Sequence, residues 1–285
     1  MIRRLVSYPF GSGLSGLGRR KFHMKRFCLI SLLLISVFFL FSVKTGNAAL
    51  VDFDDRYYYA DAWTEYDDSA DNWGSTYAYD EQTSPPVSAE ASFTRTDYSG
   101  YGLAYTNDGL NFYAGAEARN DLSDSSSYVY SSAYIEGYLY FTATTPALHV
   151  SFDYNVNVSA QTYGSDAYAY SYSDAKFTLY DYGSGSGGTY LADEYWWLDA
   201  GADPLAPSDS IIDGFFEGYF ALTEGNYYEL CLSPWDLKAE VYGNAHAYAS
   251  SDFSNVKIEA VPLPSAVLLL GSGLIGLVAL RRKSS

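Results

Sequence analysis

Two adjacent carboxylates, Asp193 and Glu194, lie beside three aromatic residues in the stretch LADEYWWLDA. A glycoside hydrolase needs two carboxylates roughly 5–9.5 Å apart. Neighbouring residues of a strand point to opposite faces, so this pair is poorly placed for one reaction centre. Aromatic rings beside acids suit sugar stacking and ordinary sheet packing equally well. We therefore predict no catalytic residues and no enzymatic activity, with a secreted glycan-active enzyme as an alternative.

A second acidic stretch, DDSADNWG, places oxygen-bearing side chains at alternate positions, Asp67, Ser69 and Asp71. Calcium prefers such hard ligands. The twelfth position from Asp67 is Ala78, where an EF-hand has a bidentate glutamate. We interpret the stretch as a solvated acidic loop and predict no required cofactor. A calcium site formed by Asp67, Ser69 and Asp71 is the alternative.

The remaining candidate ligands are isolated. His149 and His246 each fall on the polar side of an alternating stretch, which is typical of solvent-facing strand residues. Two separate histidines make neither an HExxH motif nor a Cys–His zinc set. Cys231, in YYELCLS, is expected to be a small buried residue of a strand.

Charge is divided very unevenly along the chain. All 34 acidic residues lie between Asp52 and Glu259, where only 6 of the 17 lysines and arginines are found, so this region has a formal charge of -28. Such a surface repels a phosphate backbone, and we predict no nucleic-acid partner. Cations or neutral polymers such as polysaccharides suit it better. The 30 tyrosines indicate a pleated surface with enough apolar area for a core.

Strict alternation predicts strands throughout this acidic region. In LHVSFDYNVNVSA, apolar or aromatic residues recur at every second position from Leu148 to Val158, the period of a half-buried strand. Glycine-rich breaks such as 180–190 separate similar runs, and no long run has a helical period. We predict an all-β fold, an antiparallel, jelly-roll-like β-sandwich over 49–260. We expect 51–90 to join it, with a separate module as the alternative.

Two stretches of this region resemble one another. YGSDAYAYSYSDAKFTL begins at Tyr163 and YGNAHAYASSDFSNVKIEA begins at Tyr242. Both run from Tyr-Gly through alternating alanines into a strand that carries a lysine. They are too far apart for a solenoid repeat, so we interpret them as similar hairpins that face each other across the sandwich.

The segment MKRFCLISLLLISVFFLFSVKTGNAAL, from Met24, has a basic start, an apolar run and small residues at its end. This is the pattern of a secretory signal peptide, and we predict a signal helix over 24–48 that signal peptidase cuts after Ala48 or Ala49. An uncleaved anchor is the alternative. Residues 1–23 are basic and glycine-rich, and we interpret them as a gene-model extension.

The last 25 residues, VPLPSAVLLLGSGLIGLVALRRKSS, have a second apolar run. Ser265 to Leu280 are 16 uncharged residues, a helix of roughly 24 Å at about 1.5 Å per residue. That length is short for a hydrocarbon core of about 30 Å, but basic side chains can snorkel to the interface. A basic cluster stays on the cytoplasmic side. We therefore predict a transmembrane helix that halts export, with its basic end formed by Arg281, Arg282 and Lys283.

This tail resembles the PEP-CTERM sorting signal, in its VPLPA-type variant. A proline motif, a short apolar helix and a basic end, combined with a leader, carry the resemblance. It implies an exosortase as processing enzyme, and an inner-membrane intermediate that is then sorted to the outer surface or extracellular matrix of a Gram-negative bacterium. It also implies a structural or exopolysaccharide-associated role. The alternatives are a carbohydrate- or calcium-binding module and, for the tail, a plain anchor. The predicted motif residues are Val261, Pro262, Leu263, Pro264, Ser265 and Ala266.

Overall fold

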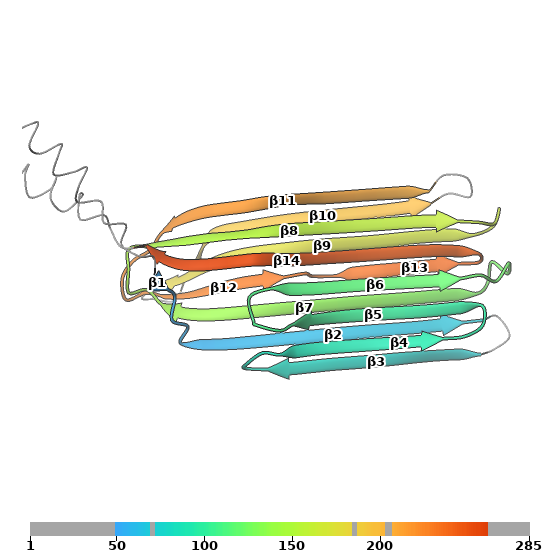
Figure 1. Ribbon diagram of the computed structural model, residues 1–285, viewed down its shortest axis with the longest axis horizontal. Helices are drawn as coiled ribbons and strands as arrows, with labels where there is room; N and C mark the ends of the chain where they lie inside the picture. The colour runs from blue at the N-terminus through green and yellow to red at the C-terminus, as the bar shows by residue number, and fades with distance from the viewer. Residues whose placement is uncertain (1–48, 69–71, 184–186, 203–206, 262–285) are drawn as a thin grey trace, which may run out of the picture. The chain divides into compact units, whose positions relative to one another are not determined.

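The computed structural model describes residues 49–68, 72–183, 187–202 and 207–261 (Figure 1). The predicted extension at 1–23, signal peptide at 24–48, transmembrane helix and basic end lie outside the described residues. Within the described ranges the chain forms strands and connections without a helix. Accordingly, that part of the chain holds no helix long and apolar enough to cross a membrane.

The strands form two antiparallel sheets of 7 strands each. Sheet A contains, in spatial order, β11 (Ser208–Ala221), β8 (Ala147–Thr162), β14 (Ala245–Val261), β6 (Phe112–Asn120), β5 (Tyr98–Thr106) and β4 (Val87–Thr94), with β1 (Ala49–Leu50) paired to β14. Sheet B contains β10 (Thr189–Ala202), β9 (Tyr168–Gly183), β12 (Tyr227–Ser233), β7 (Tyr128–Thr142), β2 (Asp55–Asp67) and β3 (Trp73–Gln82). The remaining strand, β13 (Leu237–Tyr242), follows β12 in the same row, between β7 and β9. The predicted antiparallel β-sandwich is confirmed.

The strand order makes the two sheets cover each other. Hairpins stay within one sheet at β2–β3, β4–β5–β6 and β9–β10, β12 continues into β13 within sheet B, and the other connections between described strands cross between the sheets. Contacts between the sheets join β3 with β4, β6 with β7, β8 with β9 and β10 with β11. The region 51–90 supplies β2, β3 and the start of β4, so it is part of the sandwich, as predicted.

Alternating side chains fill the space between the sheets. In β8, Leu148, Val150 and Phe152 are fully buried, whereas the residues between them face outward. The two similar stretches form β9 in sheet B and β14 in sheet A, which contact each other across the core. The hydroxyl of Ser173 in β9 donates to the carbonyl of Ser250 in β14 at 2.8 Å. The prediction that these stretches face each other is thus confirmed, although each is a strand of a different sheet and not a separate hairpin.

The composition of the core changes from one edge of the sandwich to the other. Towards β10 and β11 it is aromatic, because the ring of Phe152 lies 4.8–5.9 Å from the rings of Phe177, Phe216, Phe253 and Trp196. Towards β4 and β5 alanines dominate the buried positions, and the sheets approach closely. A Cβ at Gly102 would lie 2.4 Å from the backbone oxygen of Ser132 in the other sheet, which explains the glycine.

Candidate functional site

The carboxylate pair of the sequence lies on β10, an edge strand of sheet B. Glu194 pairs with the buried Phe177 and so lies on the inner side, whereas Asp193 pairs with Thr178 and faces outward. Both side chains are exposed. The structure therefore separates Asp193 from Glu194, as the alternation predicted.

The candidate calcium ligands are only partly described. Asp67 is the last residue of β2, and Ser69 and Asp71 lie outside the described residues. Within the described ranges no group of three or more His, Cys, Asp or Glu side chains could hold a metal ion. The calcium alternative stays a prediction.

Both histidines face outward on sheet A, as predicted, and each contacts glutamate. The Nε2 atom of His149 lies 3.0 Å from Oε1 of Glu217, and its Nδ1 atom lies 3.2 Å from Oε2 of Glu259. The ring of His149 also stacks on Tyr219, with centroids 4.4 Å apart. His246 contacts Glu117 in the same way, at 3.0 Å. These contacts link neighbouring strands and form no nucleophile or metal site.

The thiol of Cys231 is buried in β12, as predicted. Burial raises the pKa of this thiol well above its usual value, with the nearby Glu136 and Glu229 adding to the shift. A thiol that stays protonated is a poor nucleophile. Cys231 is therefore a packing residue of the sheet.

The two ends of the described body meet in sheet A. Val261, the first residue of the predicted motif, is the last residue of β14 and pairs with Ala147. Ala49, one of the two predicted cleavage positions, pairs with Ala260 through β1. Ala48 and the other motif residues lie outside the described residues. The positions next to the predicted leader and tail are thus neighbours in one sheet.

The outer side of sheet B is covered with aromatic side chains, and we call it the tyrosine face. It is made of the outward residues of β2, β3, β7, β9, β10, β12 and β13. On adjacent strands, aromatic and acidic residues alternate across the sheet: Glu65 of β2 lies opposite Tyr130 of β7, which lies opposite Glu240 of β13, which lies opposite Tyr170 of β9. Several of its rings are strongly exposed, among them Trp197 at 54%.

Tyrosine hydroxyls hold the carboxylates of this face. Tyr128 donates to Glu65 at 3.1 Å and Tyr182 donates to Glu229 at 2.5 Å. A hydrogen bond to a carboxylate is stronger than one between neutral groups, so these contacts offset part of the repulsion between acids. Burial and Glu65 raise the pKa of Tyr128, which keeps this hydroxyl a donor. The face thus carries many acids with few cations.

A bulge interrupts the middle of the tyrosine face between β12 and β13. The segment from Leu232 to Leu237 is one residue longer than the stretch of β7 that it crosses. The carbonyl of Pro234 accepts a hydrogen bond from the backbone amide of Ile135 in β7 at 3.1 Å. Asp236 has a φ angle of 25°, in the left-handed region that is strained for most residues. Bulges re-aim side chains, and this one presents Trp235 to solvent at 40% exposure.

Two buried carboxylates flank the bulge. Asp174 of β9 is 1% exposed, and its Oδ2 atom accepts hydrogen bonds from the hydroxyls of Tyr172, at 3.1 Å, and Tyr195. Its Oδ1 atom is buried and has no hydrogen-bond partner among the described residues. Burial raises the pKa of Asp174 to about 6, against the lowering effect of the two hydroxyls. Glu136 of β7 is 6% exposed, and burial raises its pKa as well.

Carboxyls with raised pKa values are typical of general acids. Asp174 and Glu136, however, are buried, and neither is among the residues that line the pocket described next. Their burial makes the centre of the tyrosine face sensitive to pH. A shallow pocket of about 310 Å³ opens beside the bulge, lined by Tyr59, Asp61, Tyr130, Ser132, Ala133, Tyr134, Trp235, Asp236 and Leu237.

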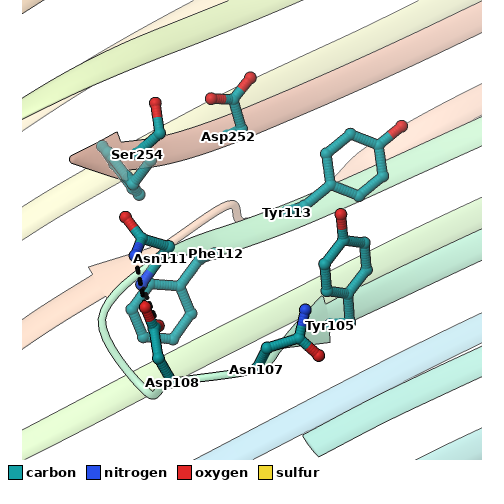
Figure 2. Close-up of a pocket in the computed structure, with 9 residues that line it drawn as sticks. Tyr105, Asn107, Asp108, Asn111, Phe112, Tyr113, Asp252 and Ser254 are labelled. Carbon is teal, nitrogen blue, oxygen red and sulfur yellow. Dashed lines mark hydrogen bonds between the residues drawn. The ribbon is translucent and has the colours of Figure 1, made fainter. Parts of the chain in front are cut away.

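A second hollow, of about 380 Å³, lies on the outer side of sheet A at the β5–β6 hairpin and β14 (Figure 2). The Asp108 carboxylate turns into the hairpin and accepts bonds from the backbone amides of Leu110, at 2.9 Å, and Asn111, at 2.8 Å. Although burial alone would raise the pKa of Asp108, these hydrogen bonds outweigh it and lower the pKa. Figure 2 shows that Asp252 points away from this loop.

The Asp108 carboxylate therefore stabilises the turn of the β5–β6 hairpin. Gly109 has φ 74, and its amide donates to the Thr106 hydroxyl at 2.9 Å. Burial raises the pKa of Asp252, and the nearby Asp153 adds to the shift. We regard the tyrosine face, with its exposed rings and its central pocket, as the better candidate site.

Sequence reasoning missed Asp174, Glu136 and Trp235. The alternation in YVYSSAYIEGYLYFT does place Glu136 on the same side as the tyrosines around it. The triplet Pro-Trp-Asp between two alternating runs was a signal for an irregularity at Trp235. No local signal shows that Asp174 is buried, because its cover comes from β10.

Comparison with known proteins gives one informative match. No curated protein matches the chain. Among solved structures, the chain is similar to TmCBM61 in complex with β-1,4-galactotriose, at 12% identity over 56% of this chain and 70% of that chain, with a TM-score of 0.19. It is also similar to the VP2 subviral particle of infectious bursal disease virus, at 9% identity over 79% and 74%, with a TM-score of 0.11. TM-scores this low carry no argument about fold or ligand.

The family model of the PEP-CTERM protein-sorting motif, in contrast, matches residues 260–283. These are the residues in which the sequence predicted a proline motif, an apolar run and a basic end. The match confirms the resemblance and implies processing by an exosortase. The chain therefore carries a C-terminal PEP-CTERM protein-sorting motif, which implies an exported protein with a membrane-associated sorting signal.

Proposed function

We propose that the protein is a non-enzymatic component of the outer surface or extracellular matrix of a Gram-negative bacterium, and that it binds exopolysaccharide through the tyrosine face. Signal peptidase and an exosortase process it, and the inner membrane holds it only during export. The sandwich is the delivered part, and its ligand is a polymer of sugars.

The observation that carries this proposal is the composition of the tyrosine face. Exposed rings such as Trp197, Trp73 and Tyr79, at 54%, 67% and 60% exposure, lie among carboxylates on one continuous sheet. Sugar rings have apolar faces that pack on aromatic rings, and hydroxyl groups that hydrogen-bond to carboxylates. A single deep pocket is not needed for a polymer that contacts many such rings.

Two further observations support a binding role over a catalytic one. The carboxyls of Asp174 and Glu136 have raised pKa values but are buried, where tyrosine hydroxyls hydrogen-bond to them. The exposed acids Asp193 and Glu194 lie on opposite sides of β10. Neither pair offers two accessible carboxyls at one reaction centre.

Affinity electrophoresis of the full chain in detergent tests the proposal. The gels contain a neutral β-glucan, chitosan or alginate. We expect at least one polymer to retard the protein, and the double variant Trp63→Ala/Trp197→Ala to lose most of the retardation. The matched control is Phe215→Ala/Tyr219→Ala on the outer side of sheet A, where the side chains are 61% and 68% exposed. Migration unaffected by every polymer, or loss in the control alone, would disprove the proposal.

A further inference from the structure

Four aromatic side chains line the pocket beside the bulge, and three of them, Tyr59, Tyr134 and Trp235, contact one another in succession. The rings of Tyr59 and Tyr134 lie 5.3 Å apart at 61°, and those of Tyr134 and Trp235 lie 5.4 Å apart at 89°. Successive edge-to-face contacts hold these rings in place. The volume of about 310 Å³ is at the lower end of ligand sites, about 300 Å³, and suits a small unit of a larger ligand.

The charges in the pocket are negative. The carboxylates of Asp61 and Asp236 both line it, and none of its described lining residues is a lysine or arginine. The hydroxyl of Tyr59 donates to Oδ2 of Asp61 at 3.1 Å, which orients that carboxylate. Lys238 pairs with Asp236 at 2.6 Å, so Asp61 is the acid of the pocket without a lysine partner among the described ion pairs.

One ring of this pocket already lies near a cation: the ammonium of Lys176 is 5.8 Å from the ring centroid of Trp235. Outside the pocket lining, the ammonium of Lys238 lies 5.9 Å from the ring centroid of Tyr172. A ring face attracts an ammonium group through its quadrupole, and more strongly where water is excluded. Aromatic walls with a carboxylate are therefore suited to a ligand that has both an apolar ring face and a positive charge.

We propose that this pocket binds an amino-sugar unit with a free, protonated amine, as part of a cationic polysaccharide. The rings of Tyr134 and Trp235 contact the apolar face of the sugar, and Asp61 accepts hydrogen bonds from the ammonium group. The formal charge of -28 over the acidic region attracts such a polymer at long range and repels an anionic one. This inference rests on the proposed function and specifies its ligand.

The test compares two oligosaccharides that differ only at nitrogen, a β-1,4-glucosamine oligomer and its fully N-acetylated form. Both are titrated into the full chain in detergent at about pH 6, with tryptophan fluorescence and calorimetry as readouts. We expect the free amine to bind at least ten-fold more tightly, and the difference to shrink as salt is added. Equal affinities would overturn the inference.

Variants separate the pocket from the general negative charge. Asp61→Asn should abolish the ten-fold preference, whereas Glu217→Gln, which removes a charge from the outer side of sheet A, should keep it. Trp235→Ala should weaken binding of both oligomers. A preference that survives Asp61→Asn would overturn the inference.

These experiments distinguish failure of the amino-sugar inference from failure of the proposed function. If neither oligomer binds but the tyrosine face still retains another polysaccharide, the amino-sugar inference fails and the proposed function stands. If no polysaccharide binds at all, both fail.

Discussion

The outer sides of the two sheets have the same alternating backbone but hold their acids differently. On sheet A, imidazoles contact the carboxylates, as His149 does with Glu217 and Glu259. On sheet B, tyrosine hydroxyls do so, as Tyr128 does with Glu65. A phenol donates a hydrogen bond without bringing a charge, so the tyrosine face stays negative while its acids are satisfied. The difference shows how an acidic surface can be stable and still attract cations.

The largest effect should come from the core that both sides share. Phe152 is fully buried and contacts rings from both sheets. We expect Phe152→Ala to lower the free energy of unfolding by about 3–5 kcal/mol, because it leaves a cavity that the rigid rings cannot fill. Urea denaturation of the full chain in detergent measures this change.

Phe215→Ala is the matched control for that variant. Phe215 is in β11, faces outward and is 61% exposed, so its loss should change the stability by less than about 0.5 kcal/mol. Equal losses in the two variants would contradict the assignment of Phe215 to the outer side.

The second effect is a pH dependence located on the tyrosine face. The pKa of Asp174 is about 6 in the folded state, against an ordinary value of 3.8, so the folded state binds one more proton than the unfolded state between about pH 4 and 6. Stability from this group is therefore present below about pH 4 and is lost as the pH rises through 6. At about 1.4 kcal/mol per unit the loss reaches about 3 kcal/mol.

Asp174→Asn removes this dependence. We expect the variant to be more stable than the natural chain at pH 8 and to lose that advantage at pH 4, as measured by urea denaturation across the range. Asp252→Asn on sheet A is the control: burial raises the pKa of Asp252 too, but this side chain is partly exposed, so the same trend should be smaller. An equal or larger trend in Asp252→Asn would remove the contrast between the two sides.

The sequence predicted the sandwich because alternation is a local property. From Leu148 to Val158 every second side chain is apolar or aromatic, and this alone sets the two sides of β8. The sorting signal could be predicted for the same reason, since its motif, apolar run and basic end are contiguous in the sequence. The candidate site could not be predicted in this way, because it depends on which strands pair. Asp174 is buried by Tyr195 of a different strand, and Trp235 projects because β12 and β13 share one row.

The third effect concerns the imidazoles of sheet A. In His149→Gln, the side chain can keep at most one of the two contacts with Glu217 and Glu259. The variant also loses the stacking on Tyr219. We expect a loss of about 1 kcal/mol in unfolding free energy, larger at low salt because two glutamates then face each other. His246→Gln, with a single glutamate contact, should lose about half as much. A salt-independent loss in His149→Gln would show that stacking, and not charge, is its contribution.

The smallest effect is a pH-dependent difference of about 0.5 kcal/mol, which distinguishes a phenol that donates to a buried carboxylate from one that does not. Tyr195 donates to Asp174, whereas Tyr219 contacts the exposed Glu217 at a long 3.4 Å. Because the hydroxyl stabilises the ionised form of Asp174, Tyr195→Phe should cost about 1 kcal/mol at pH 8 and about half of that at pH 4.5, where the carboxyl is protonated. Loss of this hydroxyl should also raise the pKa of folded Asp174, so the decline in stability should extend above pH 6. Tyr219→Phe should leave unfolding curves unchanged at both pH values. If the loss in Tyr195→Phe does not vary with pH, the hydroxyl of Tyr195 does not stabilise the ionised carboxylate of Asp174. The proposed difference between the outer sides of the two sheets would then be smaller.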